Sequence, residues 1–99
     1  MQSHKENKQC LYEAILRLKT MEDCEELFED LCTHKELEQM AIRLTAAGLL
    51  MRGATYNEIM KKVDISSATL SRISRCVQCG TGYNRFALPE QKTPVEEKA

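Results

Sequence analysis

The amino-acid sequence predicts an all-α protein, and three observations carry that prediction. The 99 residues include only 4 Gly and 2 Pro, and so few turn-forming residues favour helices over many short strands. Apolar side chains recur at helical spacing along most of the chain. Three threonines stand three residues before an acidic residue, which is the pattern of a capping box at a helix start. We therefore expect one helical domain over residues 1–88 and a flexible tail over residues 89–99.

Two helices are predicted in the first third of the chain. An apolar stripe that includes Leu11 and Ile15 predicts a helix over residues 8–19. Thr20 is a suitable N-cap for a second, shorter helix that runs to about Leu31. Because a chain of this length buries only about 60% of its unfolded surface, its own core is thin, and homo-oligomerisation would bury more.

The third predicted helix is the longest. It begins after Thr33, which has a glutamate three residues on, and it ends before Gly53, a residue suited to a helix C-terminus. Leu49 and Leu50 add a second apolar side to its main apolar stripe. A helix that is apolar around much of its circumference is buried on several faces. We therefore expect this helix to lie at the centre of the fold, at a subunit interface, or both.

Residues 55–77 predict a helix-turn-helix. Thr55 caps a short helix over residues 56–63, and Ser66 caps a second one over residues 67–77, with a tight turn between them.

The sequence contains no run of about 18 apolar residues, so we expect no membrane-spanning helix.

The charge of the chain is divided along its length. The formal net charge is −1, which by itself argues against nucleic acid as a partner. Residues 21–38, however, carry eight acids and one lysine, whereas residues 39–85 carry seven basic residues and two acids. Such asymmetry indicates a basic surface that could bind nucleic acid, although two solvated helix faces would produce the same pattern.

The second helix of the predicted helix-turn-helix has an outer face suited to a DNA major groove. If Leu70 and Ile73 are buried, the residues that point outward are Ser67, Ala68, Ser71, Arg72 and Arg75. Small side chains let a helix approach base edges closely, hydroxyls donate or accept, and arginines bind phosphates or guanine. Lys61 and Lys62 end the preceding helix, where a contact with the DNA backbone would be made. Two short helices that merely pack in a core would not require such a face.

The segment Ala68-Thr69-Leu70-Ser71-Arg72, with the helix before it and the helix end at Leu49–Gly53, resembles the tryptophan repressor superfamily. More closely, it is similar to the small tryptophan-repressor-like YerC/YecD proteins of Gram-positive bacteria, over about residues 10–88. The resemblance implies an all-helical fold, two intertwined subunits in a symmetric homodimer, and double-stranded operator DNA as the ligand. It also implies that Ser67, Ala68 and Ser71 lie nearest the bases.

The same resemblance points to an effector pocket. Arg43 and Arg72 stand where the repressor has the two arginines that line its tryptophan slot. Other positions depart from the repressor: Ile73 replaces a glycine, Cys76 a serine, and Asp30 and Cys32 apolar residues. Because a β-branched side chain would fill space that an indole needs, we expect tryptophan not to bind. Arg43 is then a surface residue, and Arg72 contacts a phosphate.

The remaining motifs predict neither an enzyme nor a cofactor site. Cys76 and Cys79 form a C-x-x-C pair, but no further ligands stand at zinc-site spacing, and a redox motif would need a βαβ context. We expect the five cysteines to be reduced thiols in a cytoplasmic protein, since no export signal precedes them. The sequence thus predicts a DNA-binding transcriptional regulator, most simply a repressor, that acts as a homodimer. The alternative is a protein-interaction module that uses the helix-turn-helix surface.

Overall fold

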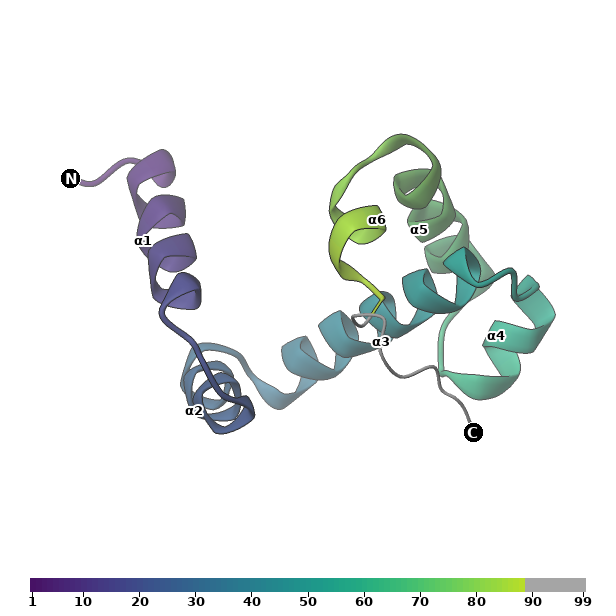
Figure 1. The fold of residues 1–99 in the computed structure, drawn as a ribbon, viewed down its shortest axis with the longest axis horizontal. Helices are drawn as coiled ribbons and strands as arrows, with labels where there is room; N and C mark the ends of the chain where they lie inside the picture. Colours follow the sequence, from purple (N-terminus) through teal and green to yellow (C-terminus); the bar gives the residue numbers. More distant parts are fainter. Residues whose placement is uncertain (89–99) are drawn as a thin grey trace. The chain divides into compact units, whose positions relative to one another are not determined.

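Residues 1–88, which the computed structural model describes, form six helices and no strands (Figure 1). The predicted all-α fold is therefore confirmed. The helices are α1 (His4–Leu16), α2 (Met21–Leu31), α3 (His34–Met51), α4 (Tyr56–Lys62), α5 (Ser67–Cys79) and α6 (Gly82–Phe86). The predicted tail, residues 89–99, lies outside the described residues.

The three helix starts predicted at threonines are confirmed, because each capping threonine makes the expected reciprocal hydrogen bonds. At the start of α4, the Glu58 N–H donates to Thr55 Oγ1 at 3.2 Å, and the Thr55 N–H donates to Glu58 Oε1 at 2.8 Å. These bonds satisfy two backbone donors that a helix N-terminus leaves free. The same reciprocal pairs begin α2 and α3, between Thr20 and Asp23 and between Thr33 and Glu36.

The first helix differs from its predicted bounds. It spans residues 4–16 rather than 8–19, because Ser3 and Glu6 form a capping box that starts it earlier. It also ends earlier than predicted, because the residues that follow it hydrogen-bond to the start of α2. The Asp23 carboxylate accepts the backbone N–H groups of residues 19 and 20, and Thr20 has the extended φ of −128°. These hydrogen bonds lower the pKa of Asp23. Residues 17–20 therefore belong to the connection between α1 and α2.

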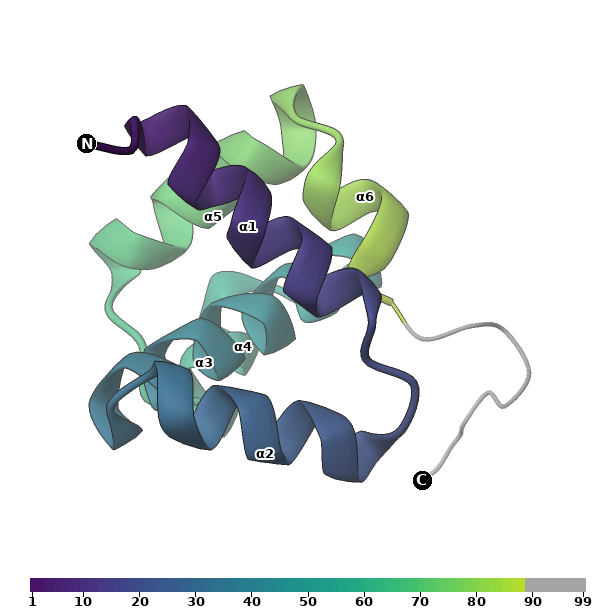
Figure 2. The ribbon, with the colours of Figure 1, turned by 90° about the vertical axis from the view of Figure 1, so that its left-hand side faces the viewer.

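The chain divides into two compact units, with the boundary inside α3, between Leu37 and Glu38. The first unit holds α1, α2 and the start of α3 (Figure 2). Neither α1 nor α2 contains a buried side chain. The second unit holds the rest of α3 together with α4, α5 and α6, and it contains all the residues of the buried core.

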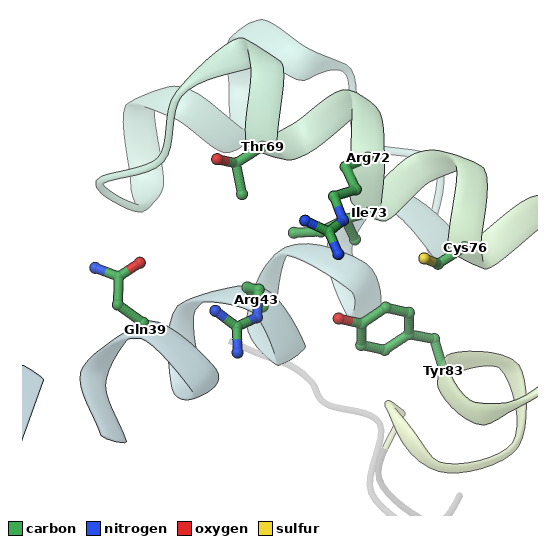
Figure 3. Close-up of a pocket in the computed structure, with 7 residues that line it drawn as sticks. All are labelled: Gln39, Arg43, Thr69, Arg72, Ile73, Cys76 and Tyr83. Carbon is green, nitrogen blue, oxygen red and sulfur yellow. The ribbon is translucent and has the colours of Figure 1, made fainter. Parts of the chain in front are cut away.

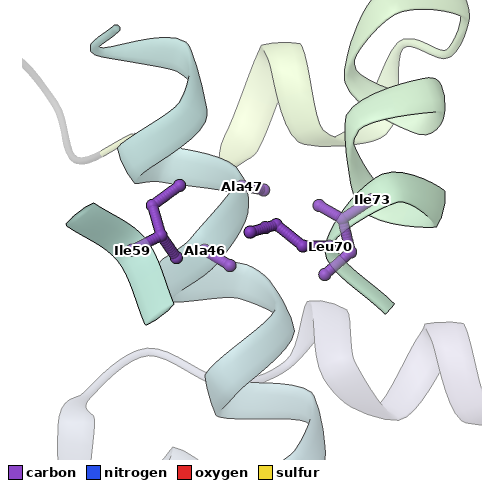
Figure 4. Packing of buried hydrophobic residues seen from close by; sticks show 5 residues of the cluster. All are labelled: Ala46, Ala47, Ile59, Leu70 and Ile73. Carbon is purple, nitrogen blue, oxygen red and sulfur yellow. The ribbon is translucent and has the colours of Figure 1, made fainter. Parts of the chain in front are cut away.

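The core of the second unit lies where α3, α4 and α5 meet (Figure 4). Two small residues, Ala46 and Ala47, contribute from α3, and Ile59 contributes from α4. Leu70 and Ile73 enter from α5, with 0% and 2% of their surface exposed. The short side chains of the two alanines leave room in this cluster for the larger apolar residues of α4 and α5. This packing fixes which face of α5 points inward.

Large apolar side chains remain exposed on several helices. Leu16 is 82% exposed and Tyr12 is 58% exposed, both on α1. Others are Ile15, Met21, Leu31, Leu44, Met60 and Phe86. Single exposed apolar residues are ordinary, but α1 and α2 present several of them and bury none.

The turn after α3 provides a first prediction. Gly53 has φ of +95°, a conformation that costs an L-residue about 1–2 kcal/mol, and nothing within 4 Å would meet an added Cβ. We expect Gly53→Ala to lower the free energy of unfolding by about that amount in urea titrations at fixed chain concentration. Gly82→Ala is the matched control, because its Cβ also meets nothing within 4 Å and its φ is not in the left-handed region. Equal losses in both variants would contradict this explanation.

Candidate nucleic-acid interface

Helices α4 and α5 form a helix-turn-helix whose turn is fixed by local hydrogen bonds. The Val63 N–H donates to the Ile59 carbonyl at 2.9 Å and ends α4, after which the backbone is extended. Ser66 starts α5: its Oγ accepts the Thr69 N–H at 3.2 Å and lies 3.1 Å from Thr69 Oγ1. Since both helices also contribute to the core, the pair is held as one element.

The outer face of α5 contains the predicted DNA-binding set. Leu70 and Ile73 are buried, as the sequence pattern requires. The residues that repeat along the opposite face are all exposed: Ser67, Ala68, Ser71, Arg72 and Arg75. Lys61 and Lys62 are exposed in the last turn of α4. The structure therefore places all seven predicted residues at the surface of one helix-turn-helix.

The electrostatics of this face favour an anion. Helix α5 carries Arg72 and Arg75 and contains no acidic residue. Lys61 and Lys62 add positive charge on the neighbouring helix. The exposed N-terminus of α5, at Ser67, adds backbone N–H groups and the positive end of the helix dipole. A polyanion with phosphates on both sides of α5 would meet favourable charge along the helix.

Tyr56 joins this surface from α4. The sequence pattern placed it on the inward face, and its half-buried ring does pack against the core. The hydroxyls of Ser74 and Ser71 on α5, and then the positive charge of Arg75, lower the pKa of Tyr56. The sequence offered one signal that Tyr56 would lie beside polar residues of another helix: a tyrosine at an inward position needs a hydrogen-bond partner for its hydroxyl.

A pocket of about 460 Å³ opens between α3 and α5 (Figure 3). Arg43 from α3 and Arg72 from α5 both line it, so the structure brings together the two predicted effector residues. Ile73 and Cys76, which the sequence analysis also assigned to this site, line it as well. The sequence analysis did not assign the remaining lining residues, which are Gln39, Thr69 and Tyr83. Asp30 and Cys32 lie at the end of α2, in the first unit.

Helix α6 is fixed to the end of α5 by one side chain. Asn84 Nδ2 donates to the Val77 carbonyl at 2.7 Å and to the Gly80 carbonyl at 3.0 Å. These carbonyls lie at the C-terminus of α5, where backbone acceptors lack helical partners. The clamp holds the neighbouring Tyr83 against the pocket, with its hydroxyl directed toward Arg43 (Figure 3).

The cysteines are free thiols in the structure. Cys76 and Cys79 are both exposed near the C-terminal end of α5, and Cys76 also lines the pocket. Within residues 1–88, no three His, Cys, Asp or Glu side chains come together in a group that could hold a metal ion. In the same part of the chain, no helix is both long enough and apolar enough to cross a membrane.

The fold defines a helix-turn-helix protein whose second helix, α5, presents an exposed basic face. Comparison with known proteins narrows this class. A family model described as Trp repressor protein matches residues 6–92, which is most of the chain. The chain therefore belongs to the Trp repressor family, in agreement with the resemblance carried by residues 68–72.

Individual relatives agree with the family assignment. The uncharacterized protein YerC of Bacillus subtilis is 38% identical over 89 residues, which cover 90% of this chain and 86% of the relative. A crystal structure of a candidate Trp repressor from Staphylococcus aureus superposes with a TM-score of 0.77, at 36% identity over 81% of both chains. A TrpR-like protein from Eubacterium eligens superposes with a TM-score of 0.75, at 37% identity over 78% of this chain and 80% of that one.

Proposed function

We propose that this protein is a sequence-specific, DNA-binding transcriptional regulator, most simply a repressor, that inserts α5 into the major groove. The observation that carries the proposal is the outer face of α5, where small and hydroxyl side chains at the N-terminal end adjoin two arginines, without an acid. Membership of the Trp repressor family supports it. Such a protein binds DNA rather than catalysing a reaction, and it works in the cytoplasm, where the bacterial chromosome lies.

The proposed contacts divide by chemistry. Ser67, Ala68 and Ser71 lie near the N-terminal end of α5, where a recognition helix reaches base edges. Arg72 and Arg75 bind phosphates or the acceptor edge of guanine. The lysine pair at the end of α4, Lys61 and Lys62, neutralises phosphates beside the groove.

We propose that the active form is a symmetric homodimer. The exposed apolar side chains on α1 and α2, such as Leu16 and Tyr12, are the surface that a second copy would cover. Neither helix buries a side chain in the single chain, whereas an intertwined partner would provide one shared core. A two-fold dimer presents two α5 helices about 34 Å apart to successive major grooves.

The pocket beside α5 is a second candidate site, for an effector. Two guanidinium groups, Arg43 and Arg72, face it together with the Tyr83 hydroxyl (Figure 3). This lining suits a small anion more than an indole, because Ile73 is the only aliphatic side chain that residues 1–88 contribute to it. We propose that tryptophan is not the ligand.

The alternative function is a protein-interaction module that docks a partner on the helix-turn-helix. The same exposed face would then contact an acidic protein surface rather than phosphates. The first experiment below separates these two functions.

We expect the double substitution R72A/R75A to weaken binding to DNA fragments selected from random sequence by at least about tenfold, because phosphate contacts are lost. The slope of log K against log salt should fall by about one for each lost contact. Fluorescence anisotropy over a salt series measures both quantities. The control is R17A/K19A, which removes the same charge from an exposed stretch after α1. Unchanged DNA binding in R72A/R75A, with circular dichroism showing an intact fold, would favour the interaction module.

Sedimentation equilibrium tests the dimer. The wild-type chain should sediment at twice its 11.3 kDa, and Leu16→Gln should weaken the dimer by at least about 100-fold, because one apolar side chain per subunit loses its buried place. Lys8→Gln introduces the same residue at an exposed polar position on α1 and should leave the dimer intact. A wild-type chain that remains monomeric at all concentrations would refute the proposal.

Thermal unfolding tests the effector specificity. A ligand at 100 times its Kd raises stability by about 2.7 kcal/mol, so bound tryptophan would be visible as a raised Tm. We expect no shift with millimolar L-tryptophan, because Ile73 and the arginine pair leave no flat apolar slot. A saturable shift that disappears in Arg72→Ala would show that tryptophan does bind in this pocket.

A further inference from the structure

Cys76 and Cys79 are a pair of exposed thiols in the last turn of α5. They stand three residues apart on one helix, so their side chains are neighbours on its surface. None of the other cysteines, at positions 10, 24 and 32, has a second cysteine within one helical turn. Cys76 also lines the pocket beside α5 (Figure 3). Small molecules in solvent can therefore reach both thiols.

The geometry of an α-helix brings such a pair close to the geometry of a disulfide. With a rise of about 1.5 Å per residue and a radius of about 2.3 Å, Cα atoms three residues apart are separated by about 5 Å. Disulfides join Cα atoms that are about 4.4–6.8 Å apart. Their Cβ atoms, however, lie about 3.8 Å apart, whereas neighbouring Cβ atoms on a helix lie about 5–6 Å apart. A disulfide between Cys76 and Cys79 can thus form without unfolding α5, but it must draw the two Cβ atoms together by about 1–2 Å.

The backbone of this turn is already tightly packed. The Gly80 N–H donates to the Cys76 carbonyl at 2.7 Å and ends the helix. A Cβ added at Gly80 would lie 2.8 Å from that same oxygen. Asn84 Nδ2 bridges two further carbonyls, donating to Val77 at 2.7 Å and to Gly80 at 3.0 Å. A disulfide that pulls Cys76 and Cys79 together must therefore move the acceptors that hold α6.

We propose that Cys76 and Cys79 are a reversible oxidation site, in which hydrogen peroxide closes a disulfide in the last turn of α5 and loosens the hold of Asn84 on α6. Tyr83, the neighbour of Asn84, lines the pocket, so the redox state of the pair changes the shape of that pocket. Disulfides in cytosolic proteins are usually transient and redox-sensing, and a strained disulfide is readily reduced again. The pair needs no βαβ context, because it is itself modified and catalyses no exchange on other proteins.

The reaction consumes one peroxide for each pair of cysteines. One thiolate attacks an oxygen of hydrogen peroxide: an S–O bond forms, the O–O bond breaks, and the departing hydroxide takes the thiol proton and becomes water. The second thiol then attacks the sulfenic acid: the S–S bond forms, the S–O bond breaks, and a second water leaves with the second thiol proton. The two sulfurs together lose two electrons, which the peroxide gains. Dithiothreitol reverses the oxidation by thiol–disulfide exchange.

Mass spectrometry of the full-length wild-type chain tests the site. Trypsin cleaves after Arg75 and Arg85, so one peptide, residues 76–85, contains both cysteines of the pair and no other. After treatment with hydrogen peroxide and digestion without reductant, we expect this peptide to have lost two hydrogen atoms, and dithiothreitol should restore them. Cys79→Ser is the matched control. Its peptide cannot form the internal disulfide, and it should gain oxygen at Cys76 instead.

Amide hydrogen exchange measured by NMR tests the effect on α6. The reporters are the N–H groups of Arg85 and Ala87, which donate to the carbonyls of residues 81 and 83. We expect both to exchange at least about fivefold faster in the oxidised chain, as the loss of one neutral hydrogen bond would produce. Asn84→Ala should cause the same increase without oxidation. Oxidation of that variant should add no further increase, because the disulfide acts through Asn84.

Several outcomes would overturn the proposal. An unmodified peptide 76–85, oxygen addition without a disulfide, or a disulfide only between two chains would refute the oxidation site. An internal disulfide with unchanged exchange at Arg85 and Ala87 would refute its effect on α6. An equal increase at Val63, whose N–H donates to Ile59 in α4, would indicate general unfolding and contradict a local effect. Since none of these measurements uses DNA, their outcome is independent of the proposed DNA-binding function.

Discussion

The close packing of α4 and α5 against Ala46 and Ala47 of α3 is the constraint on which the rest of the second unit depends. The five buried residues form one cluster, in which the two alanines lie between Ile59 and the pair Leu70 and Ile73 (Figure 4). That contact fixes the rotation of α5, and the rotation determines that serines and arginines face outward. A larger residue at either alanine position would disturb this cluster and turn the outer face of α5 together with the core.

Local signals explain why much of this fold can be predicted from sequence. Capping boxes at Thr20, Thr33 and Thr55 and the apolar period of α5 depend on residues three or four positions apart, and all of them appear in the structure. The start of α1 was predicted late, although Ser3 and Glu6 form the same kind of box, because the residues that follow Ser3 are polar and show no period. Periodicity locates only the part of a helix that carries apolar side chains, and in this helix the apolar stripe begins at Leu11.

Contacts between distant residues could not be predicted in this way. Arg43 and Arg72 were paired by resemblance to a family and not by spacing, and the structure places both at one pocket. Tyr83 joins them from α6, which Asn84 clamps to the end of α5. Such contacts follow from tertiary packing, which no local pattern encodes.

Ile73 serves two regions at once, since it belongs to the core and also lines the pocket beside α5. Arg72, its neighbour, lines the same pocket and is exposed on the recognition helix. A molecule that occupies the pocket therefore acts on the same helix that DNA would contact. Thermodynamic linkage then requires reciprocity: whatever change in DNA affinity such a molecule causes, DNA causes in the affinity for that molecule. The pocket and the outer face of α5 are therefore two sites on the same helix.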